Sequence, residues 1–379
     1  MQLSGLRNLV FIAVLSRICI FLVMIIGFYF FPFNIIAHDA NFVYPPNEVV
    51  TPSTSFKTWD GQHYIFLAEK GYSPNLMSNV IYPLYPILLH FFRIIFLNNT
   101  LLTGLVLSNS FFFVALIYFY MFVKKLFDEN IAFISSLFFL AFPTSFYTGL
   151  VYTESLFLML AILFLYFLYQ RDLFPALITA FLLPLARAQG ILIICPLIIF
   201  IFLQNFEKGK FRFRFTREYL LLLGFATGFI SYLCFMNYFT GSYFTGFVTQ
   251  QKYYIAHYSI LNLMDPIGWF MNNFVNISLT LHGYKTSIID RLFFIGFLAL
   301  LYPAYKKLDK TLFFYMLALG LFPAILGSMM AYTRYVFEAF PMFIVMALLF
   351  KEKHYYATIP MIVLQTIFVL RQALNYWVS

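Results

Sequence analysis

The chain has very little charge and very little cysteine for its length, and both shortages exclude classes of protein. Only 10% of its 379 residues are Asp, Glu, Lys or Arg, whereas 62% are hydrophobic and 22% are aromatic. Water-soluble domains of this size do not have such a composition, so the sequence indicates a polytopic membrane protein. The three cysteines, Cys19, Cys195 and Cys234, lie in apolar runs without a C-x-x-C spacing. The absence of this spacing argues against a disulfide framework and against a zinc site, and we expect buried, inert thiols.

The first apolar run, residues 9–31, has no small-residue cleavage site after it. It is also too long for the core of a cleaved signal peptide. We therefore expect this run to be a retained first membrane span.

Basic residues outnumber acidic ones and give a net charge of +9, but their placement argues for membrane topology and against a nucleic-acid partner. More than half of the Lys and Arg residues occur at Arg7 and in short loops between apolar runs. The positive-inside rule places these loops on the cytoplasmic side, where the basic run 207–218 would contact lipid headgroups. The loops are 124–125, 171, 207–218, 306–310 and 351–353.

Holding those loops inside the cell predicts about 11 transmembrane helices, with the N-terminus inside and the C-terminus outside. Residues 81–97 are apolar enough to cross, but a crossing there would invert the side of every later basic loop. Since this segment also contains Pro83, Pro86, His90 and Arg93, we expect a re-entrant or interface-lying helix. The predicted spans are 9–31, 101–123, 131–147, 153–169, 173–186, 189–203, 219–239, 289–305, 311–330, 335–350 and 355–372.

This topology gathers the unusual polar residues on the outer side of the membrane. The outer segments are residues 32–100, 143–155, 187–189, 240–288 and 331–335. Charged residues near a membrane are costly and usually functional, so we expect them to converge on one outward-facing cavity. The charged residues in question are Asp60, Glu154, Arg187, Lys252 and Arg334.

Five motifs follow one another along the chain: WDGQHYIFLAEKGY, YPLYP, FPTSFYTGLVYTESLF, ARAQG and RYVFEAFP. In this order they resemble the PIG-V family (GPI mannosyltransferase 2-like) and its prokaryotic relatives, in the GT-C class of membrane glycosyltransferases. The resemblance covers about residues 5–350, and it departs at ARAQG, where relatives often have a proline after the arginine.

The resemblance implies a single all-α, GT-C-like membrane domain, residues 1–379, with outer-face helices and the catalytic acid in outer loop 32–100. It implies a prokaryotic plasma membrane, membrane lipids as surroundings, and an active site facing outside. It also implies a polyprenyl-phosphate sugar donor, typically carrying mannose, and a lipid-linked, glycan or protein acceptor.

The residue chemistry suits such a transfer. A carboxylate can take the proton of an acceptor hydroxyl, and Asp60 is our first candidate for this base, with Glu154 as the second catalytic acid. The phosphate that leaves needs positive charge around it, which Arg187, Lys252 and Arg334 can supply. One base without a positioned nucleophile predicts a single displacement with inversion.

Further residues are expected to bind substrate, and they have structural alternatives. Asp60 could serve only as a helix N-cap, and Glu154 could serve only the dipole of its helix. His63 lies one helical turn after Asp60 and could share a metal ion or a phosphate with it. The sequence fixes no cofactor and no metal-ligand set, and leaves Mg²⁺ or Mn²⁺ at the donor phosphate open. The expected substrate contacts are Trp59, His63, Tyr64, Tyr152, Arg187, Gln189, Lys252, Arg334 and Tyr335.

Two other classes of function compete with an enzyme. A transporter or flippase of lipid-linked sugars would have similar spans, but it typically shows internal repeats and broken helices, and no such repeat is evident. A non-catalytic scaffold would have no reason to collect acids and arginines on one side. The sequence therefore favours a glycosyltransferase.

Overall fold

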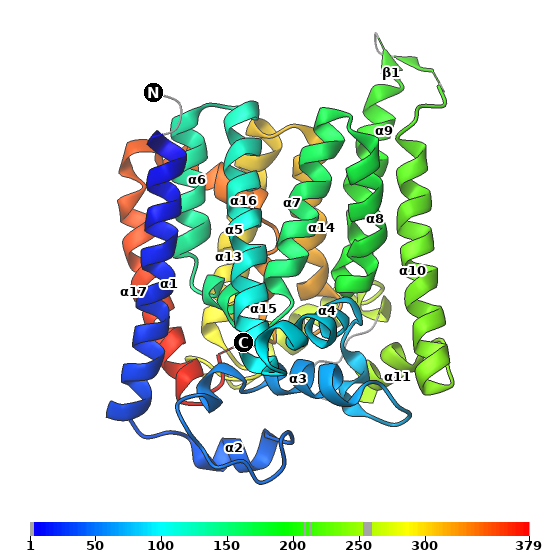
Figure 1. Cartoon of the computed structure of the whole chain (residues 1–379). Coiled ribbons are helices and arrows are strands. Elements are labelled where there is room, and N and C mark those ends of the chain that lie inside the picture. The colour runs from blue at the N-terminus through cyan, green and yellow to red at the C-terminus, as the bar shows by residue number, and fades with distance from the viewer. Residues whose placement is uncertain (1–3, 208–209, 213, 253–259, 379) are drawn as a thin grey trace.

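The computed structural model describes residues 4–207, 210–212, 214–252 and 260–378, and it is helical apart from two short strands. Strands β1 (Phe206–Glu207) and β2 (Lys210–Phe211) form one antiparallel pair, in whose backbone register Phe206 is opposite Phe211. Most of the helices run side by side and form a bundle (Figure 1). The predicted all-α fold is confirmed.

Five helices among the described residues are long and apolar enough to cross a membrane. A rise of about 1.5 Å per residue gives helices of this length a span close to the roughly 30 Å of hydrocarbon in a bilayer. Large apolar side chains such as Phe11 and Phe30 are exposed on these helices, as expected of surfaces that face lipid. The five are α1 (Ser4–Phe30), α5 (Thr100–Leu126), α10 (Tyr219–Thr240), α13 (Ile288–Lys307) and α17 (Tyr355–Ala373).

The other six predicted spans correspond to shorter helices, so the count of about 11 spans stays a prediction. The predicted span 335–350 contains the last two residues of α15 and the whole of α16, whose 10 residues reach about half of the hydrocarbon thickness. Helices α6 and α14 also end earlier than the apolar runs 131–147 and 311–330 that contain them. The shorter helices are α6 (Glu129–Ala141), α7 (Glu154–Gln170), α8 (Leu173–Ala186), α9 (Ile194–Gln204), α14 (Lys310–Ile325) and α16 (Pro341–Phe350).

Helix α7 lies in the interior of the bundle and packs against α5 and α8, and α8 packs in turn against α10. Gly228 allows α8 and α10 to pack closely, because a Cβ atom there would overlap the carbonyl oxygen of Phe181. These packed helices fix the ends of α7 and α8, which carry candidate residues.

Short helices cover one end of the bundle, and the N-terminus and the β1–β2 hairpin lie at the other (Figure 1). Helix α4 lies across that first end instead of running along the bundle, and its place at the membrane interface stays a prediction. The covering helices are α2 (Ile35–Asn41), α3 (Asp60–Lys70), α4 (Leu84–Phe92) and α11 (Thr245–Lys252). The remaining short helices are η1 (Thr54–Phe56), η2 (Met77–Val80), η3 (Arg93–Phe96), η4 (Ser145–Gly149), η5 (Ala188–Ile193), η6 (Ile260–Leu263), α12 (Pro266–Phe270), η7 (Met271–Val275), α15 (Tyr332–Val336) and η8 (Lys351–Lys353).

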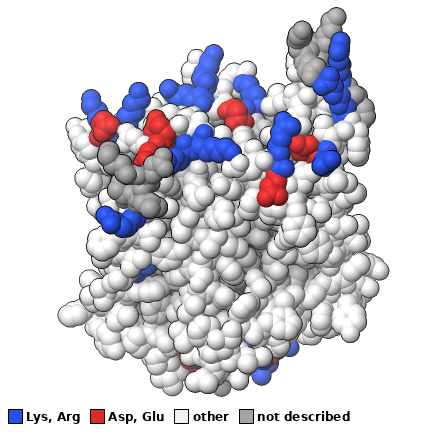
Figure 2. Space-filling view, turned by 45° about the horizontal axis from the view of Figure 1, so that its top comes forward, with Lys and Arg blue, Asp and Glu red and all other residues white. Residues whose placement is uncertain are grey.

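Lysine and arginine gather at the end that carries the hairpin (Figure 2). The basic loops identified in the sequence connect helices at this end, for example Lys124 and Lys125 at the end of α5 and Lys306 and Lys307 at the end of α13. The charge pattern of the sequence is therefore also a pattern in space.

The expectation that the three cysteines are buried is wrong. Cys19 on α1 and Cys234 on α10 are exposed, and only Cys195 is partly covered, because the first two lie on the outward faces of long helices. A cysteine in an apolar run need not be buried in protein, because one side of a membrane helix can face lipid.

Candidate active site

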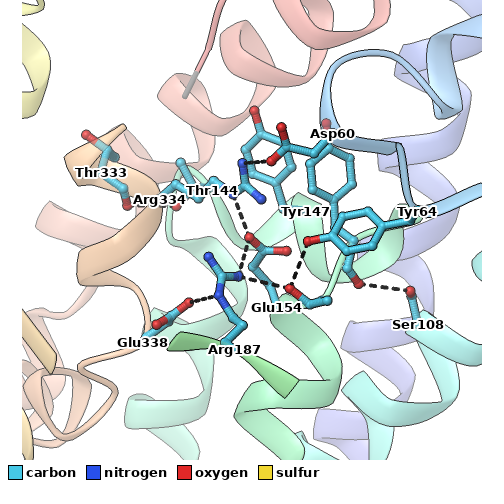
Figure 3. Close-up of polar contacts among 12 residues, drawn as sticks. Asp60, Tyr64, Ser108, Thr144, Tyr147, Glu154, Arg187, Thr333, Arg334 and Glu338 are labelled. Atoms are coloured by element: carbon cyan, nitrogen blue, oxygen red, sulfur yellow. Dashed lines mark hydrogen bonds and ion pairs between the residues drawn. The ribbon is translucent and has the colours of Figure 1, made fainter. Parts of the chain in front are cut away.

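Five charged side chains, Asp60, Glu154, Arg187, Arg334 and Glu338, meet in one cluster (Figure 3). Arg334 on α15 donates from Nη1 to Oδ2 of Asp60 at 2.8 Å and from Nε to Oε1 of Glu154 at 2.5 Å. Arg187, which follows α8, lies with Nη1 2.6 Å from the same Oε1 and with Nε 3.2 Å from Oε1 of Glu338. The cluster thus joins three acids through two arginines.

The members of this cluster differ strongly in burial. The side chain of Asp60 is 48% exposed, whereas those of Glu154 and Glu338 are 1% and 0% exposed. Both arginines are nearly buried as well. Buried charges persist only when opposite charges and hydrogen bonds offset their loss of hydration, so the acids beneath the surface hold the arginines in place.

Aromatic rings complete the support of Arg334. Its guanidinium carbon lies 4.9 Å from the ring centre of Tyr147 and 4.8 Å from that of Tyr152, within the range of cation–π contacts. The hydroxyl of Tyr152 donates to the carbonyl oxygen of Thr58 at 3.0 Å, which ties the support to the segment before α3. Arg334 is therefore held from several sides.

Next to the cluster lies a cavity of about 620 Å³ whose lining combines charged and apolar residues. Asp60, Arg187 and Arg334 line it together with other polar groups. One apolar part of the lining comes from η5, from α14, which packs on η5, and from the segment after α14. The apolar lining residues of this part are Ile191, Leu192, Phe322, Pro323, Leu326 and Met330.

Most of the predicted substrate contacts line this cavity. Trp59, His63, Tyr64, Gln189 and Tyr335 are among its lining residues, together with Asp60 and the two arginines. Three predicted residues are not. Glu154 and Tyr152 lie beneath it, each 1% exposed, and Lys252 is an exposed residue at the end of α11.

Lys252 misses the cavity because α11 presents Gly246, Phe247 and Gln250 to it. Residues 253–259, which form most of the tyrosine-rich stretch after Lys252, lie outside the described residues.

His63 is placed beside the cavity by α3 and contacts Oγ of Ser78 through Nδ1 at 2.8 Å. Burial lowers the pKa of this imidazole, and the nearby Asp60 carboxylate offsets only part of that effect. In the described part of the chain, no group of three or more His, Cys, Asp or Glu side chains is arranged to hold a metal ion. The metal alternative for His63, which involves only His63, Asp60 and the donor phosphate, stays a prediction.

The interpretation of Asp60 as the N-cap of its helix is wrong. Asp60 is the first residue of the helix, and Trp59 occupies the N-cap position without a side-chain capping bond. The apolar residues Ile65, Leu67 and Ala68 are at most 5% exposed because α3 packs on α4 and α5, so they do not face lipid headgroups. The helix is fixed by protein contacts.

Three residues at the site were missed by sequence reasoning. Glu338 follows Arg334 by four residues in an apolar stretch, and an acid in such a setting was itself a signal. Tyr284 and Trp377 line the cavity from the loop before α13 and from the segment after α17. No local pattern distinguished these two from other aromatics near a membrane surface.

Comparison with protein families and with curated proteins gives no match. Among solved structures, the chain is similar to the oligosaccharyltransferase of Archaeoglobus fulgidus. The apo form gives a TM-score of 0.49 at 16% identity, over 93% of this chain and 56% of that one. The form tethered to an acceptor peptide gives 0.47 at 14% identity, over 93% and 55%. The form with an inhibitory peptide and a dolichol-phosphate gives 0.44 at 14%, over 93% and 55%. The chain thus spans about half the length of these proteins.

Proposed function

We propose that this chain is a membrane glycosyltransferase of the GT-C class. It transfers a hexose, with mannose as the first candidate, from a polyprenyl-phosphate donor to a hydroxyl of a lipid-linked, glycan or protein acceptor. The site faces the outside of a prokaryotic plasma membrane, as the basic loops at the opposite end of the bundle favour.

The observation that carries this proposal is a half-exposed carboxylate in a cavity that is lined both by a charged cluster and by an apolar group of residues. A polyprenyl-phosphate sugar has the same division, since its isoprenoid is apolar and its phosphate and sugar are polar. The apolar lining residues of η5, α14 and the segment after α14, among them Ile191 and Met330, would contact the first isoprene units. Asp60 and the two arginines would contact the phosphate and the sugar.

Asp60 is the proposed general base, because it is the only carboxylate among the described residues that line the cavity. Arg334 fixes one of its oxygens, Oδ2, and no described residue donates a hydrogen bond to Oδ1. That oxygen can take the proton of an acceptor hydroxyl while the hydroxyl oxygen attacks the anomeric carbon and the polyprenyl phosphate departs. With one carboxylate available, the displacement inverts the anomeric configuration.

Arg187 and Arg334 are the proposed partners of the phosphate. Each uses Nε and Nη1 for the acids of the cluster, and neither Nη2 forms a hydrogen bond with a described residue. Both arginines line the cavity, so these donors can stabilise the charge of the leaving phosphate. Glu154 and Glu338 then position the arginines and do not touch the substrate.

The test uses the purified full chain in liposomes, supplied with radiolabelled polyprenyl-phosphate mannose, glucose or galactose and a crude membrane fraction as acceptor source. We expect the label of one sugar to leave its carrier and to become covalently bound to an acceptor. Movement of the intact labelled lipid between leaflets without loss of the sugar would instead support a flippase. Retention of every label on its carrier would reject the proposed donor.

A further inference from the structure

Three aromatic side chains line the cavity next to Asp60, and we call them the aromatic platform: Trp59, Tyr284 and Trp377. The rings of Trp59 and Trp377 meet edge to face with centres 5.3 Å apart, and the ring of Tyr284 lies 4.3 Å from that of Trp377. We propose that this platform binds a hexose ring of the acceptor, which makes the acceptor a carbohydrate chain or a glycosylated lipid or protein. The proposal rests on the transferase function proposed above.

The chemistry of the platform suits a sugar. Tryptophan and tyrosine rings stack on the apolar C–H face of a hexose, and their polar groups can bond its hydroxyls. The indole N–H groups of Trp59 and Trp377 are both buried without a hydrogen-bond partner among the described residues. Buried donors normally have acceptors, and a ligand rich in hydroxyls would provide them.

The backbone holds the platform in place at a conformational cost. Trp59 has φ 55° and ψ −124°, a combination that residues with a side chain rarely adopt. Such strain persists where surrounding contacts fix it, and it is commonest at functional sites. Trp377 is fixed differently, because Arg371 donates to its carbonyl oxygen from Nε at 3.2 Å and from Nη2 at 2.9 Å.

The position of the platform assigns it to the acceptor and not to the donor. Its residues come from the segment before α3, the loop before α13 and the segment after α17, all of which lie outside the long helices. The apolar part of the lining that suits the isoprenoid comes from η5, α14 and the segment after α14. A lipid donor reaches the cavity from the bilayer, whereas a hydrophilic glycan arrives from water, on the side of the connecting segments.

Intrinsic fluorescence can test sugar binding directly, because two of the three tryptophans of the chain belong to the platform. The purified full chain, in a detergent without a sugar headgroup, is titrated with methyl hexopyranosides and with their disaccharides. We expect a saturable change with at least one sugar, and a roughly 10-fold weaker affinity in Trp377→Ala, the scale of one good aromatic contact. Trp377→Phe keeps a ring and should retain most of the affinity.

Tyr243→Ala is the matched control, since Tyr243 is an exposed aromatic between α10 and α11 that does not line the cavity. Its affinity should equal that of the unaltered chain. In the transfer assay, Trp377→Ala should raise the KM for the acceptor about 10-fold and leave the Kd for the labelled donor unchanged.

The outcomes separate this proposal from the transferase proposal. Saturable sugar binding that depends on Trp377, without any transfer, would leave the platform standing and reject the transferase. Normal transfer with an unchanged acceptor KM in both Trp377→Ala and Tyr284→Ala would overturn the platform alone. Weaker donor binding in these variants at an unchanged acceptor KM would overturn its assignment to the acceptor.

Discussion

Replacing Glu154 with glutamine should destabilise the protein far more than replacing Asp60 with asparagine, although both changes remove one negative charge from the same cluster. Glu154 is 1% exposed, and a single oxygen accepts from Arg334 at 2.5 Å and lies 2.6 Å from Nη1 of Arg187. Removing one partner of a buried ion pair leaves the other uncompensated and typically costs about 3–5 kcal/mol. The Asp60 side chain is 48% exposed, and water screens its pair with Arg334, so we expect a loss of about 0–1 kcal/mol.

The comparison is made as the thermal midpoint at which each purified variant loses its monodisperse peak in one detergent. Glu154→Gln should lower this midpoint by several degrees, while Asp60→Asn should stay close to the unaltered chain. Glu69→Gln, on the same helix as Asp60, controls for loss of an acid outside the cluster. Equal midpoints for Glu154→Gln and the unaltered chain would contradict the buried network, and an equal loss in both cluster variants would contradict the difference in burial.

Three more predictions concern the donor, the topology and pH. Arg187→Lys should weaken binding of the labelled donor about 10-fold, because lysine keeps the charge but loses the planar fork; unchanged affinity would remove Arg187 from the phosphate site. In a background without the native cysteines, Lys252→Cys should react with an impermeant thiol reagent outside intact cells and Lys307→Cys should not; the reverse pattern would invert the topology. Burial lowers the pKa of His63 in the folded chain, so that His63 binds a proton more readily in the unfolded chain. The free energy of unfolding should therefore fall as pH drops below about 6.5. His63→Gln should reduce this loss, and an identical pH profile of the thermal midpoint would argue against it.

Hydropathy predicts the long helices well, because a helix that faces lipid needs an unbroken apolar run. It predicts the ends of interior helices poorly. The apolar character of residues 311–330 continues past Ile325, where α14 ends, and the run 131–147 continues past Ala141, where α6 ends. Inside a protein, irregular backbone can be as apolar as helix, provided that neighbouring groups satisfy its hydrogen bonds, as Gln365 does for the carbonyl oxygens of Leu140 and Phe142.

The charge pattern places four of the five predicted charged residues on one site, since Asp60, Glu154, Arg187 and Arg334 meet in the structure. The sequence did not predict which of these residues line the cavity and which lie beneath it. Topology assigns residues to a side of the membrane, and it cannot tell that Asp60 faces the cavity while Glu154 lies beneath it. Lys252 shares that side, but the orientation of α11 turns other residues to the cavity.

The central claim, that Asp60 takes the proton of the acceptor, is tested most directly by the transfer rate of Asp60→Asn. Asparagine keeps the size of the side chain but cannot act as a base, so transfer from the labelled polyprenyl-phosphate sugar should fall roughly 10²-fold or more. Glu69→Gln, whose acid contacts Tyr44 and lies outside the cavity, should keep the normal rate. Donor binding and thermal midpoint of Asp60→Asn should stay near those of the unaltered chain. Near-normal turnover of Asp60→Asn would contradict the account.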